Sequence, residues 1–411
     1  MDGRWATLVR DGAWLNARRV RAYAVLLLLA YAAMLWRVFG EATRGAGSDF
    51  LAFWGAARLT VAGSPALAYD LAAEASAQAQ SGLSSFFAYV NPPPFLLAIA
   101  PLGLLPYAAA LVAWVLAGWA VWLLVARRVL PHATLAIAAF PGAWLAASHA
   151  QNGFLIGAIL IGGVLALKRS PWLAGALFGA LIVKPHLALL IPLWLAAGRQ
   201  WKPFAAAGLS ALALCLLSLA AFGLDTWLAY PQSFAVSEAI MRDSEPVFFL
   251  RMSTVYAGLR YHFGPELALA GQAAVTLACA VLVGLVWRRT RDTDAAGALL
   301  LAATALGSPY LFSYDLAFLA MPLFWLVREG RTRGFRPYEK AALVALYFAP
   351  LAARAVALPF ELNLTPLAAL GLVALVWTRT APQAQVASGG RLIRIASMLP
   401  PVLSPNSVPR S

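Results

Sequence analysis

Long apolar stretches, separated by short segments rich in basic residues, run along the chain from residue 22 to residue 378. Most are close to the roughly 20 residues that a helix needs to cross the hydrocarbon core of a bilayer. The expected spans are 22–39, 106–126, 133–148, 153–167, two within 172–198, 204–222, 266–287, 296–312, 314–327, 341–357 and 364–378. The pattern predicts an all-α, polytopic membrane protein of about 12 transmembrane helices.

The stretch 172–198 is too short for the two spans assigned to it, since two full spans need roughly 40 residues. Lys184-Pro185 stands at its middle. Proline removes a backbone donor and disfavours helix at the residue before it. Irregular backbone at membrane depth is tolerated only where protein or a watery cavity surrounds it. We therefore expect two half-depth helices that meet at Lys184, with this lysine lining a cavity open to the outside.

The basic residues give the orientation, because cytoplasmic connections are enriched in Lys and Arg. They cluster at residues 4–21, 127–128, 168–169, 199–202, 288–291, 328–340 and from 379 onward. Both termini are then cytoplasmic, and two long segments at about 40–93 and 223–265 are outer loops, expected to carry short interfacial helices. Residues 1–21 form a cytoplasmic segment and 22–378 a single membrane domain. The tail 379–411, rich in Pro, Ser and Gly, is expected to be cytoplasmic and disordered.

Composition agrees with this class and removes one alternative. The chain is 62% hydrophobic and only 12% charged, with a mean hydropathy of +0.75. Its net charge of +14 is typical of a nucleic-acid binder, but here the charge marks the cytoplasmic loops, so no nucleic-acid partner is expected. No small-residue cleavage site follows the first apolar stretch, which therefore reads as a span and not as a signal peptide.

Few polar residues fall at the outer face, and ionisable groups at such places are functional candidates because burying a charge is costly. Asp49 comes first, a few residues beyond the first span. The others are Asp70, Glu74, Asn91, His149, Gln151, Asn152, Lys184, His186, Tyr310, Tyr314 and Asp315.

Each of the main candidates also has a structural interpretation. Asp49 is a favoured cap residue for a helix beginning at Phe50. Lys184 is long enough to snorkel to lipid phosphate. His149 and Gln151 suit hydrogen bonds between helices, and Asp315 suits a structural pair with a nearby cation.

Several segments together resemble bacterial glycosyltransferase family 87, over roughly residues 45 to 325. The resemblance lies in their order and membrane placement: Gly47-Ser48-Asp49-Phe50, Phe53-Trp54, Ala56-Ala57-Arg58, Gly63-Ser64-Pro65, Tyr69-Asp70, Tyr89 to Phe95, Gln151-Asn152-Gly153, Ala174 to Gly179, Lys184-Pro185-His186 and Tyr314-Asp315-Leu316. The chain departs from the family in the second outer loop. There Leu250-Arg251-Met252-Ser253 stands where members often carry an Asn near a Ser.

The resemblance implies a type C glycosyltransferase, a multi-helix membrane enzyme with its active site facing outside. It implies inverting transfer of a hexose, with mannose the family expectation, from a polyprenyl-phosphate donor to a lipid or glycan acceptor. An acidic residue in the first outer loop is then the base, which corresponds to Asp49. The location would be the cytoplasmic (inner) membrane, among membrane lipids.

The chemistry supports a single carboxylate at such a site. One general base must take the proton from the acceptor hydroxyl, whereas a phosphate leaving group needs no strong acid. Cations near that phosphate should stabilise it. We assign Asp49 as catalytic, and substrate binding to Lys184, His186, His149, Gln151, Asn152, Tyr314, Asp315 and Arg251. We expect no cofactor and no metal. Asp292-Thr293-Asp294 has the metal-binding pattern of nucleotide-sugar transferases, but the topology puts it in a cytoplasmic loop.

A transporter or lipid flippase of envelope biogenesis is the alternative function. A broken helix with a lysine at membrane depth also suits a transport site. Against this alternative, no matching interrupted segment occurs at the corresponding place in the second half of the chain.

Overall fold

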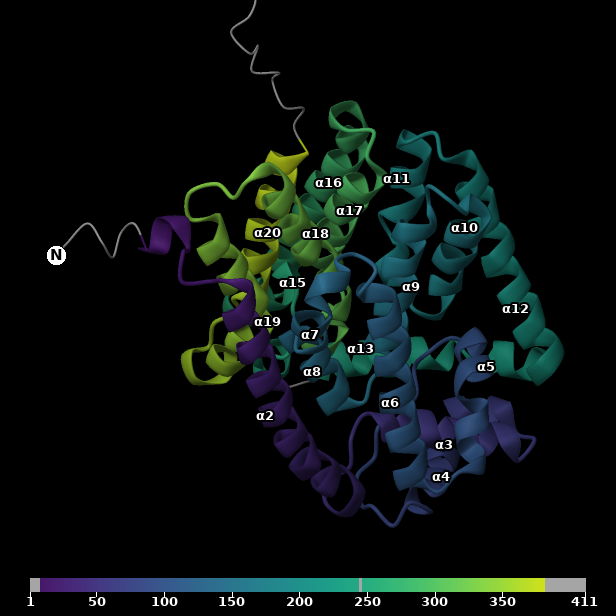
Figure 1. Cartoon of the computed structure of the whole chain (residues 1–411). Helices are drawn as coiled ribbons and strands as arrows, with labels where there is room; N and C mark the ends of the chain where they lie inside the picture. Colours follow the sequence, from purple (N-terminus) through teal and green to yellow (C-terminus); the bar gives the residue numbers. More distant parts are fainter. Residues whose placement is uncertain (1–7, 244–245, 381–411) are drawn as a thin grey trace, which may run out of the picture. The chain divides into compact units, whose positions relative to one another are not determined.

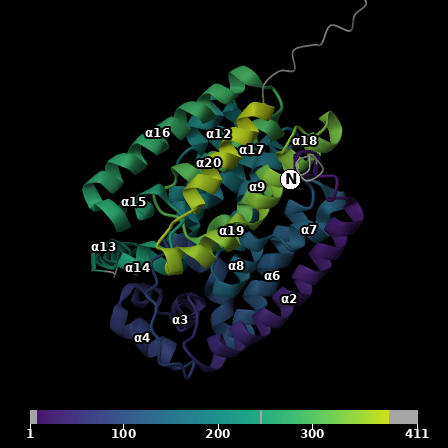
Figure 2. The ribbon, with the colours of Figure 1, turned by 90° about the vertical axis from the view of Figure 1, so that its left-hand side faces the viewer.

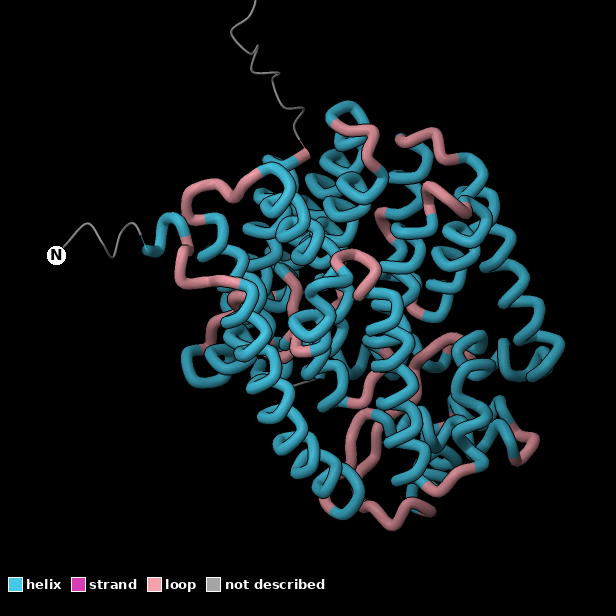
Figure 3. The backbone as a smooth tube through the Cα atoms, in the orientation of Figure 1, coloured by secondary structure: helices cyan, strands magenta, loops and turns pink. Residues whose placement is uncertain are grey.

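A computed structural model of the chain describes residues 8–243 and 246–380. Within these residues the regular elements are all helices (Figure 3), apart from a one-residue antiparallel bridge between Met252 and Phe312. The predicted all-α class is therefore confirmed. The predicted disorder of the tail concerns residues that, from 381 onward, lie outside the described part.

In the described part of the chain, five helices are long and apolar enough to cross a membrane: α2 (Ala17–Arg44), α6 (Tyr107–Ala126), α12 (Trp201–Ala229), α16 (Pro265–Arg289) and α19 (Glu339–Phe360). The chain is thus a multi-pass membrane protein, as expected. Shorter apolar helices lie between them (Figure 1). The total of about twelve crossings stays a prediction, because these shorter elements do not reach full membrane length.

The shorter elements are interrupted where the sequence contains proline or polar residues. The predicted span 133–148 is divided into α7 (Thr134–Ala138) and α8 (Pro141–His149). The others are η4 (Pro131–Ala133), α9 (Gly153–Ala166), α10 (Pro171–Gly179), η5 (Ala180–Val183), η6 (Pro185–Ala188), α11 (Ile191–Ala197), α17 (Thr293–Gly307), η7 (Ser313–Leu319), α18 (Ala320–Arg333) and α20 (Thr365–Arg379).

The predicted break in the stretch 172–198 is present. Lys184 has φ −151° and ψ 67°, outside the helical region, and separates η5 from η6. Proline follows it, so the next residue has no N–H with which to continue the helix. The break therefore lies where the sequence places it.

The two segments predicted to be outer loops both contain short helices, as expected. The first has α3 (Phe50–Val61), η1 (Pro65–Tyr69), α4 (Leu71–Ala79), η2 (Pro93–Phe95), α5 (Leu96–Ile99) and η3 (Ala100–Leu104). The second has α13 (Gln232–Asp243), α14 (Pro246–Phe249) and α15 (Val255–Phe263). In Figures 1 and 2, α3 and α4 lie at the end of the molecule that α2 reaches at its C-terminus, and Figure 1 shows α12 leading into α13.

Helix α12 extends beyond its predicted end at 222. It continues to Ala229, but its backbone is broken at Gly223, with φ 78° and ψ 168°. Residues with a side chain rarely adopt these backbone angles, whereas glycine adopts them without steric cost. The boundary expected at 222–223 is thus a kink within α12.

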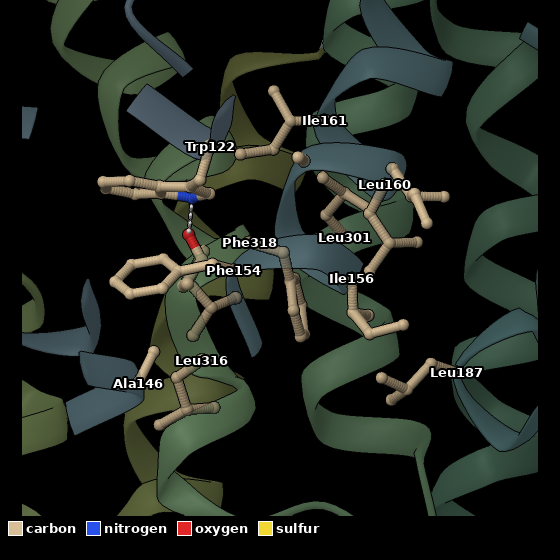
Figure 4. Close-up of a cluster of buried hydrophobic side chains, with 14 of the residues drawn as sticks. Trp122, Ala146, Phe154, Ile156, Leu160, Ile161, Leu187, Leu301, Leu316 and Phe318 are labelled. Carbon is tan, nitrogen blue, oxygen red and sulfur yellow. Dashed lines mark hydrogen bonds between the residues drawn. The ribbon is translucent and has the colours of Figure 1, made fainter. Parts of the chain in front are cut away.

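The segment η7 runs through the core of the bundle. Leu316 and Phe318 from η7 lie in a buried cluster with Phe154 of α9 (Figure 4). The indole N–H of Trp122 on α6 donates to the carbonyl oxygen of Ala317 at 3.1 Å. This bond satisfies a backbone group that the irregular segment would otherwise leave unpaired. The packing fixes η7, and with it the neighbouring Asp315.

Candidate active site

Asp49 lies in the short connection between α2 and α3. Gly47 turns the chain with φ 73°, and α3 begins at Phe50. Asp49 has helical backbone angles, and its carboxylate makes no capping bond to α3. Asp49 thus occupies the N-cap position of α3, but its side chain does not cap the helix. Its Oδ2 atom instead accepts a hydrogen bond of 3.3 Å from the side-chain amide of Gln151.

Gln151 reaches Asp49 from a strained turn between α8 and α9. Ala150 ends α8 in the left-handed region, with φ 51° and ψ 32°. This conformation costs a residue other than glycine roughly 1–2 kcal/mol. The indole N–H of Trp114 donates to the carbonyl oxygen of Gln151 at 3.3 Å. Strain held in place by surrounding contacts is typical of functional sites.

The surroundings of Asp49 have opposing effects on the pKa of its carboxyl group. Burial raises the pKa of the Asp49 carboxyl above its usual value of 3.8. The charge of His149 and the hydrogen bond from Gln151 oppose this rise, followed by the charges of Arg251 and Lys184. The net result is a carboxylate with a raised pKa in a field of cations. A raised pKa brings a carboxylate closer to the range that suits a general base at neutral pH.

Lys184 is the centre of a buried polar network. Its ammonium donates to Asp315 Oδ1 at 2.5 Å and to Asn152 Oδ1 at 3.1 Å, and it lies 5.5 Å from the centre of the Tyr314 ring. The backbone N–H of Phe312 donates to the other oxygen of Asp315 at 3.2 Å. Lys184 is only 7% exposed and Asp315 is fully buried.

These contacts decide two of the structural alternatives. Lys184 does not snorkel to the membrane surface, because its charge is paired inside the protein. Asp315 makes the ion pair that the sequence left open as its structural role. The pair joins segments more than a hundred residues apart, and a buried pair of this kind is far more sensitive to loss of one partner than an exposed pair.

The two histidines pack against tyrosines. The ring of His149 lies 5.4 Å from that of Tyr314, and its Nδ1 atom lies 3.0 Å from the carbonyl oxygen of Leu145. The ring of His186 lies 5.3 Å from that of Tyr310. His186 Nε2 is buried and has no hydrogen-bond partner within the described residues. It is therefore a polar atom available to a bound molecule.

The segment that contains α14 and α15 is held by hydrogen bonds to two other parts of the chain. The N–H of Ser253 donates to the carbonyl oxygen of Leu311 at 2.7 Å, next to the bridge between Met252 and Phe312. The amide of Asn363, between α19 and α20, donates to the carbonyl oxygen of Met252 at 3.0 Å. Arg251 is the residue immediately before this anchored segment.

Arg354 is a charged residue that the sequence analysis did not single out. It lies on α19, and its Nη1 atom is buried without a hydrogen-bond partner in the described part of the chain. The signal was present in the sequence, since an arginine within the apolar stretch 341–357 is costly and points to function.

The remaining acidic candidates have local partners. Asp70 caps α4 by accepting from the N–H of Ala73 at 2.8 Å. Glu74 Oε2 accepts from the N–H of Tyr89 at 2.9 Å, and burial raises the pKa of Glu74 to about 8. Among the described residues, no group of three or more His, Cys, Asp or Glu side chains is placed to hold a metal ion.

The pattern Asp292-Thr293-Asp294 serves the fold. Asp292 is the N-cap residue of α17, and its Oδ1 atom accepts from the N–H of Asp294 at 3.0 Å. Asp294 in turn forms an ion pair of 2.9 Å with Arg328 on α18. Both carboxylates thus already have partners in the protein. They are also far in sequence from the residues around Asp49.

Comparison with known families gives one match. The sequence model of glycosyltransferase family 87 matches residues 89–313, more than half of the chain. No curated protein and no solved structure matches it. The match is narrower than the resemblance expected over residues 45 to 325. It contains Lys184 and Arg251, and it leaves Asp49, Asp315 and Arg354 outside.

Proposed function

Since this chain belongs to glycosyltransferase family 87 and is a membrane glycosyltransferase, we propose that it moves a hexose from a polyprenyl phosphate to a hydroxyl group of a lipid or glycan acceptor. Mannose is the proposed sugar. The reaction takes place at the outer face of the cytoplasmic membrane, with both termini of the chain in the cytoplasm.

Asp49 is the proposed general base. It accepts the proton of the acceptor hydroxyl while the hydroxyl oxygen attacks the anomeric carbon. The new bond forms on one side of that carbon as the bond to the phosphate oxygen breaks on the other, so the configuration inverts. The electron pair leaves with the polyprenyl phosphate, which needs no proton to be a stable leaving group.

One observation carries this assignment. The Asp49 carboxylate is not used to cap its own helix, and only Gln151 donates to it among the described residues. Burial together with nearby cations gives a carboxylate that is partly desolvated yet lies beside groups suited to a phosphate. A base in such a place combines a raised pKa with electrostatic stabilisation of the leaving group.

The network around Lys184 has a different proposed role from that of Asp49. Two of the three ammonium hydrogens are directed at Asp315 and Asn152. Lys184 therefore supplies a fixed positive charge and holds the turn that carries Gln151. His149, His186 and Tyr314 are proposed to contact the sugar or its phosphate around the open side of this network.

The test is sugar transfer from radiolabelled polyprenyl-phosphate mannose to membrane glycolipids by the purified full chain in lipid. We expect labelled glycolipid with this donor and none with a nucleotide-linked mannose. Polyprenyl-phosphate glucose and arabinose test the choice of sugar. Transfer from the nucleotide sugar alone would contradict the proposed donor class.

A further inference from the structure

Asn363 joins the loop between α19 and α20 to the segment that follows Arg251 (Figure 2). We infer that Asn363 is a positioning residue for the active site: its side-chain amide holds residues 252–254 against the beginning of η7, which carries Asp315. The effect of Asn363 on sugar transfer rests on the proposed function, whereas its contacts do not. Asn363 lies outside residues 89–313, the part of the chain that matches the family.

The side chain of Asn363 uses both of its polar ends. Its amide nitrogen donates to the carbonyl oxygens of Met252 at 3.0 Å and of Thr254 at 3.2 Å. Its oxygen accepts from the N–H of Thr365, the first residue of α20, at 3.3 Å. A carboxamide can donate twice from one end and accept at the other, whereas an ionised carboxylate of the same shape can only accept. The donated bonds hold the segment 252–254, and the accepted bond holds the beginning of α20.

The segment that Asn363 holds is buried and pairs with the chain at the beginning of η7. Met252, Ser253 and Thr254 are each 2% exposed or less. The bridge between Met252 and Phe312 is isolated, with no further strand residues beside it in the described part of the chain. Such a short pairing needs support from other contacts to persist. The two bonds from Asn363 reach the carbonyl oxygens on either side of Ser253 and supply this support.

Phe312 links this pairing to the buried ion pair. Its N–H donates to Asp315 Oδ2 at 3.2 Å, and the N–H of Asp315 donates to the carbonyl oxygen of Phe312 at 3.0 Å. The other oxygen of Asp315 accepts from Lys184 at 2.5 Å. A fully buried carboxylate that loses one of its donors is strongly disfavoured. The direction of the Asp315 carboxylate toward Lys184 therefore depends on where the backbone of Phe312 is held.

Other contacts keep the fold when those of Asn363 are lost. Trp122 holds η7 at Ala317, in the core of the bundle. Gln272 on α16 accepts from the N–H of Tyr256 at 2.9 Å and so holds α15 by a separate bond. Asn363 itself is half-buried and lies in a loop. Loss of its donated bonds should therefore loosen the beginning of η7 without unfolding the helix bundle.

Two variants separate the two ends of the Asn363 side chain. Asn363→Asp keeps an oxygen for the N–H of Thr365 but, when ionised, cannot donate to either carbonyl. Asn363→Gln keeps both ends, one methylene further from the backbone. A role limited to the turn before α20 ranks Asp above Gln, because Asp is favoured in such turns. The positioning role ranks Gln above Asp.

Asn16→Asp is the matched control. Asn16 caps α2, and its side-chain oxygen accepts from the N–H of Arg19 at 3.0 Å. Asp caps a helix as well as Asn does, so the same substitution should leave this contact intact. The control therefore carries the added negative charge without the loss of donated hydrogen bonds.

The structural test is hydrogen exchange of the full chain in lipid, followed at the amides of Ser253 and Phe312. We expect Asn363→Asp to speed their exchange about tenfold to thirtyfold, the increase in local opening that follows the loss of two hydrogen bonds. Asn363→Gln should lie between this variant and the wild type, and Asn16→Asp should match the wild type. Unchanged exchange at Phe312 in Asn363→Asp, or an equal increase in the control, would overturn the inference.

The functional test is sugar transfer by the same proteins, compared at equal amounts of folded chain. Displacement of groups around the reacting atoms lowers the rate of the chemical step, so kcat should fall about tenfold to a hundredfold in Asn363→Asp. KM for the donor should stay within about twofold of the wild type. Asn363→Gln should recover part of kcat. A wild-type kcat in Asn363→Asp, or a higher kcat for Asp than for Gln, would contradict the positioning role.

Exchange is measured without substrate, so the two possible failures can be told apart. If the wild type transfers no sugar from any polyprenyl phosphate while exchange at Phe312 still depends on Asn363, the proposed function fails and the structural link stands. If the wild type transfers sugar but kcat does not respond to the Asn363 variants, the proposed function stands and the positioning role fails.

Discussion

The buried pair between Lys184 and Asp315 gives a prediction with a defined size. Lys184→Met leaves the Asp315 carboxylate fully buried without its cation, and Asp315→Asn leaves the Lys184 ammonium without its anion. Removing one partner of a buried pair costs about 3–5 kcal/mol, because the other charge stays desolvated. In the double variant neither charge remains, so its loss of unfolding free energy should be only about 1–2 kcal/mol.

The assay is reversible unfolding in detergent, followed by the fluorescence of the chain's 15 tryptophans. The two single variants and the double variant form a thermodynamic cycle whose coupling energy should be several kcal/mol. Glu238→Gln is the control, because the pair of Glu238 with Arg242 is exposed and should contribute about 0.5 kcal/mol or less. Single variants that each cost less than about 1 kcal/mol, or effects that simply add, would refute the reasoning.

Sugar transfer by the double variant separates two roles of Lys184. If Lys184 acts mainly by neutralising the buried Asp315, transfer should recover in part together with stability. Transfer that stays absent in a well-folded double variant would show that the ammonium itself is required, through its bond to Asn152 or through the substrate.

Three further predictions concern other parts of the chain. Glu74 is protonated in the folded protein up to its pKa of about 8, whereas in the unfolded chain it is ionised above about pH 4.5. Between these values the free energy of unfolding should fall by about 1.4 kcal/mol per pH unit. Glu74→Gln should make the unfolding midpoint less dependent on pH in this range. A side chain at Gly153 would clash with the carbonyl oxygen of Tyr314, so Gly153→Ala should cost about 1–3 kcal/mol and lower the rate of transfer, whereas Gly208→Ala, which has open space, should not. Cysteines at the exposed positions Ala62 and Ala235 should both react with an impermeant thiol reagent added from outside; reaction of only one would break the predicted topology.

Much of the fold could be read from hydropathy, because spans and basic loops are one-dimensional signals. The break at Lys184 was also predictable, since proline acts on its immediate neighbour. The lengths of the helices were harder to predict. The division of 133–148 into α7 and α8 and the passage of η7 through the core depend on tertiary contacts such as that of Trp122 with Ala317, which no local pattern reveals.

The sequence predicted which residues belong to the site better than it predicted their contacts. Sequence placed Asp49, Gln151 and Lys184 at one face, and the structure brings Gln151 to Asp49 and Asn152 to Lys184. The sequence did not show which partner each side chain would take, because pairing between residues more than a hundred positions apart depends on how the helices pack. Arg354 was missed although its residue type in an apolar span is itself a signal.

The central claim is that Asp49 is the base for transfer from a polyprenyl phosphate. The most direct measurement compares the rate of radiolabelled mannose transfer by the wild type and by Asp49→Asn, at equal amounts of folded protein. Asp70→Asn in the same outer loop is the matched control, because Asn also caps a helix well. We predict a loss of about a hundredfold to ten-thousandfold for Asp49→Asn and little change for the control. Transfer by Asp49→Asn at the wild-type rate would contradict the account.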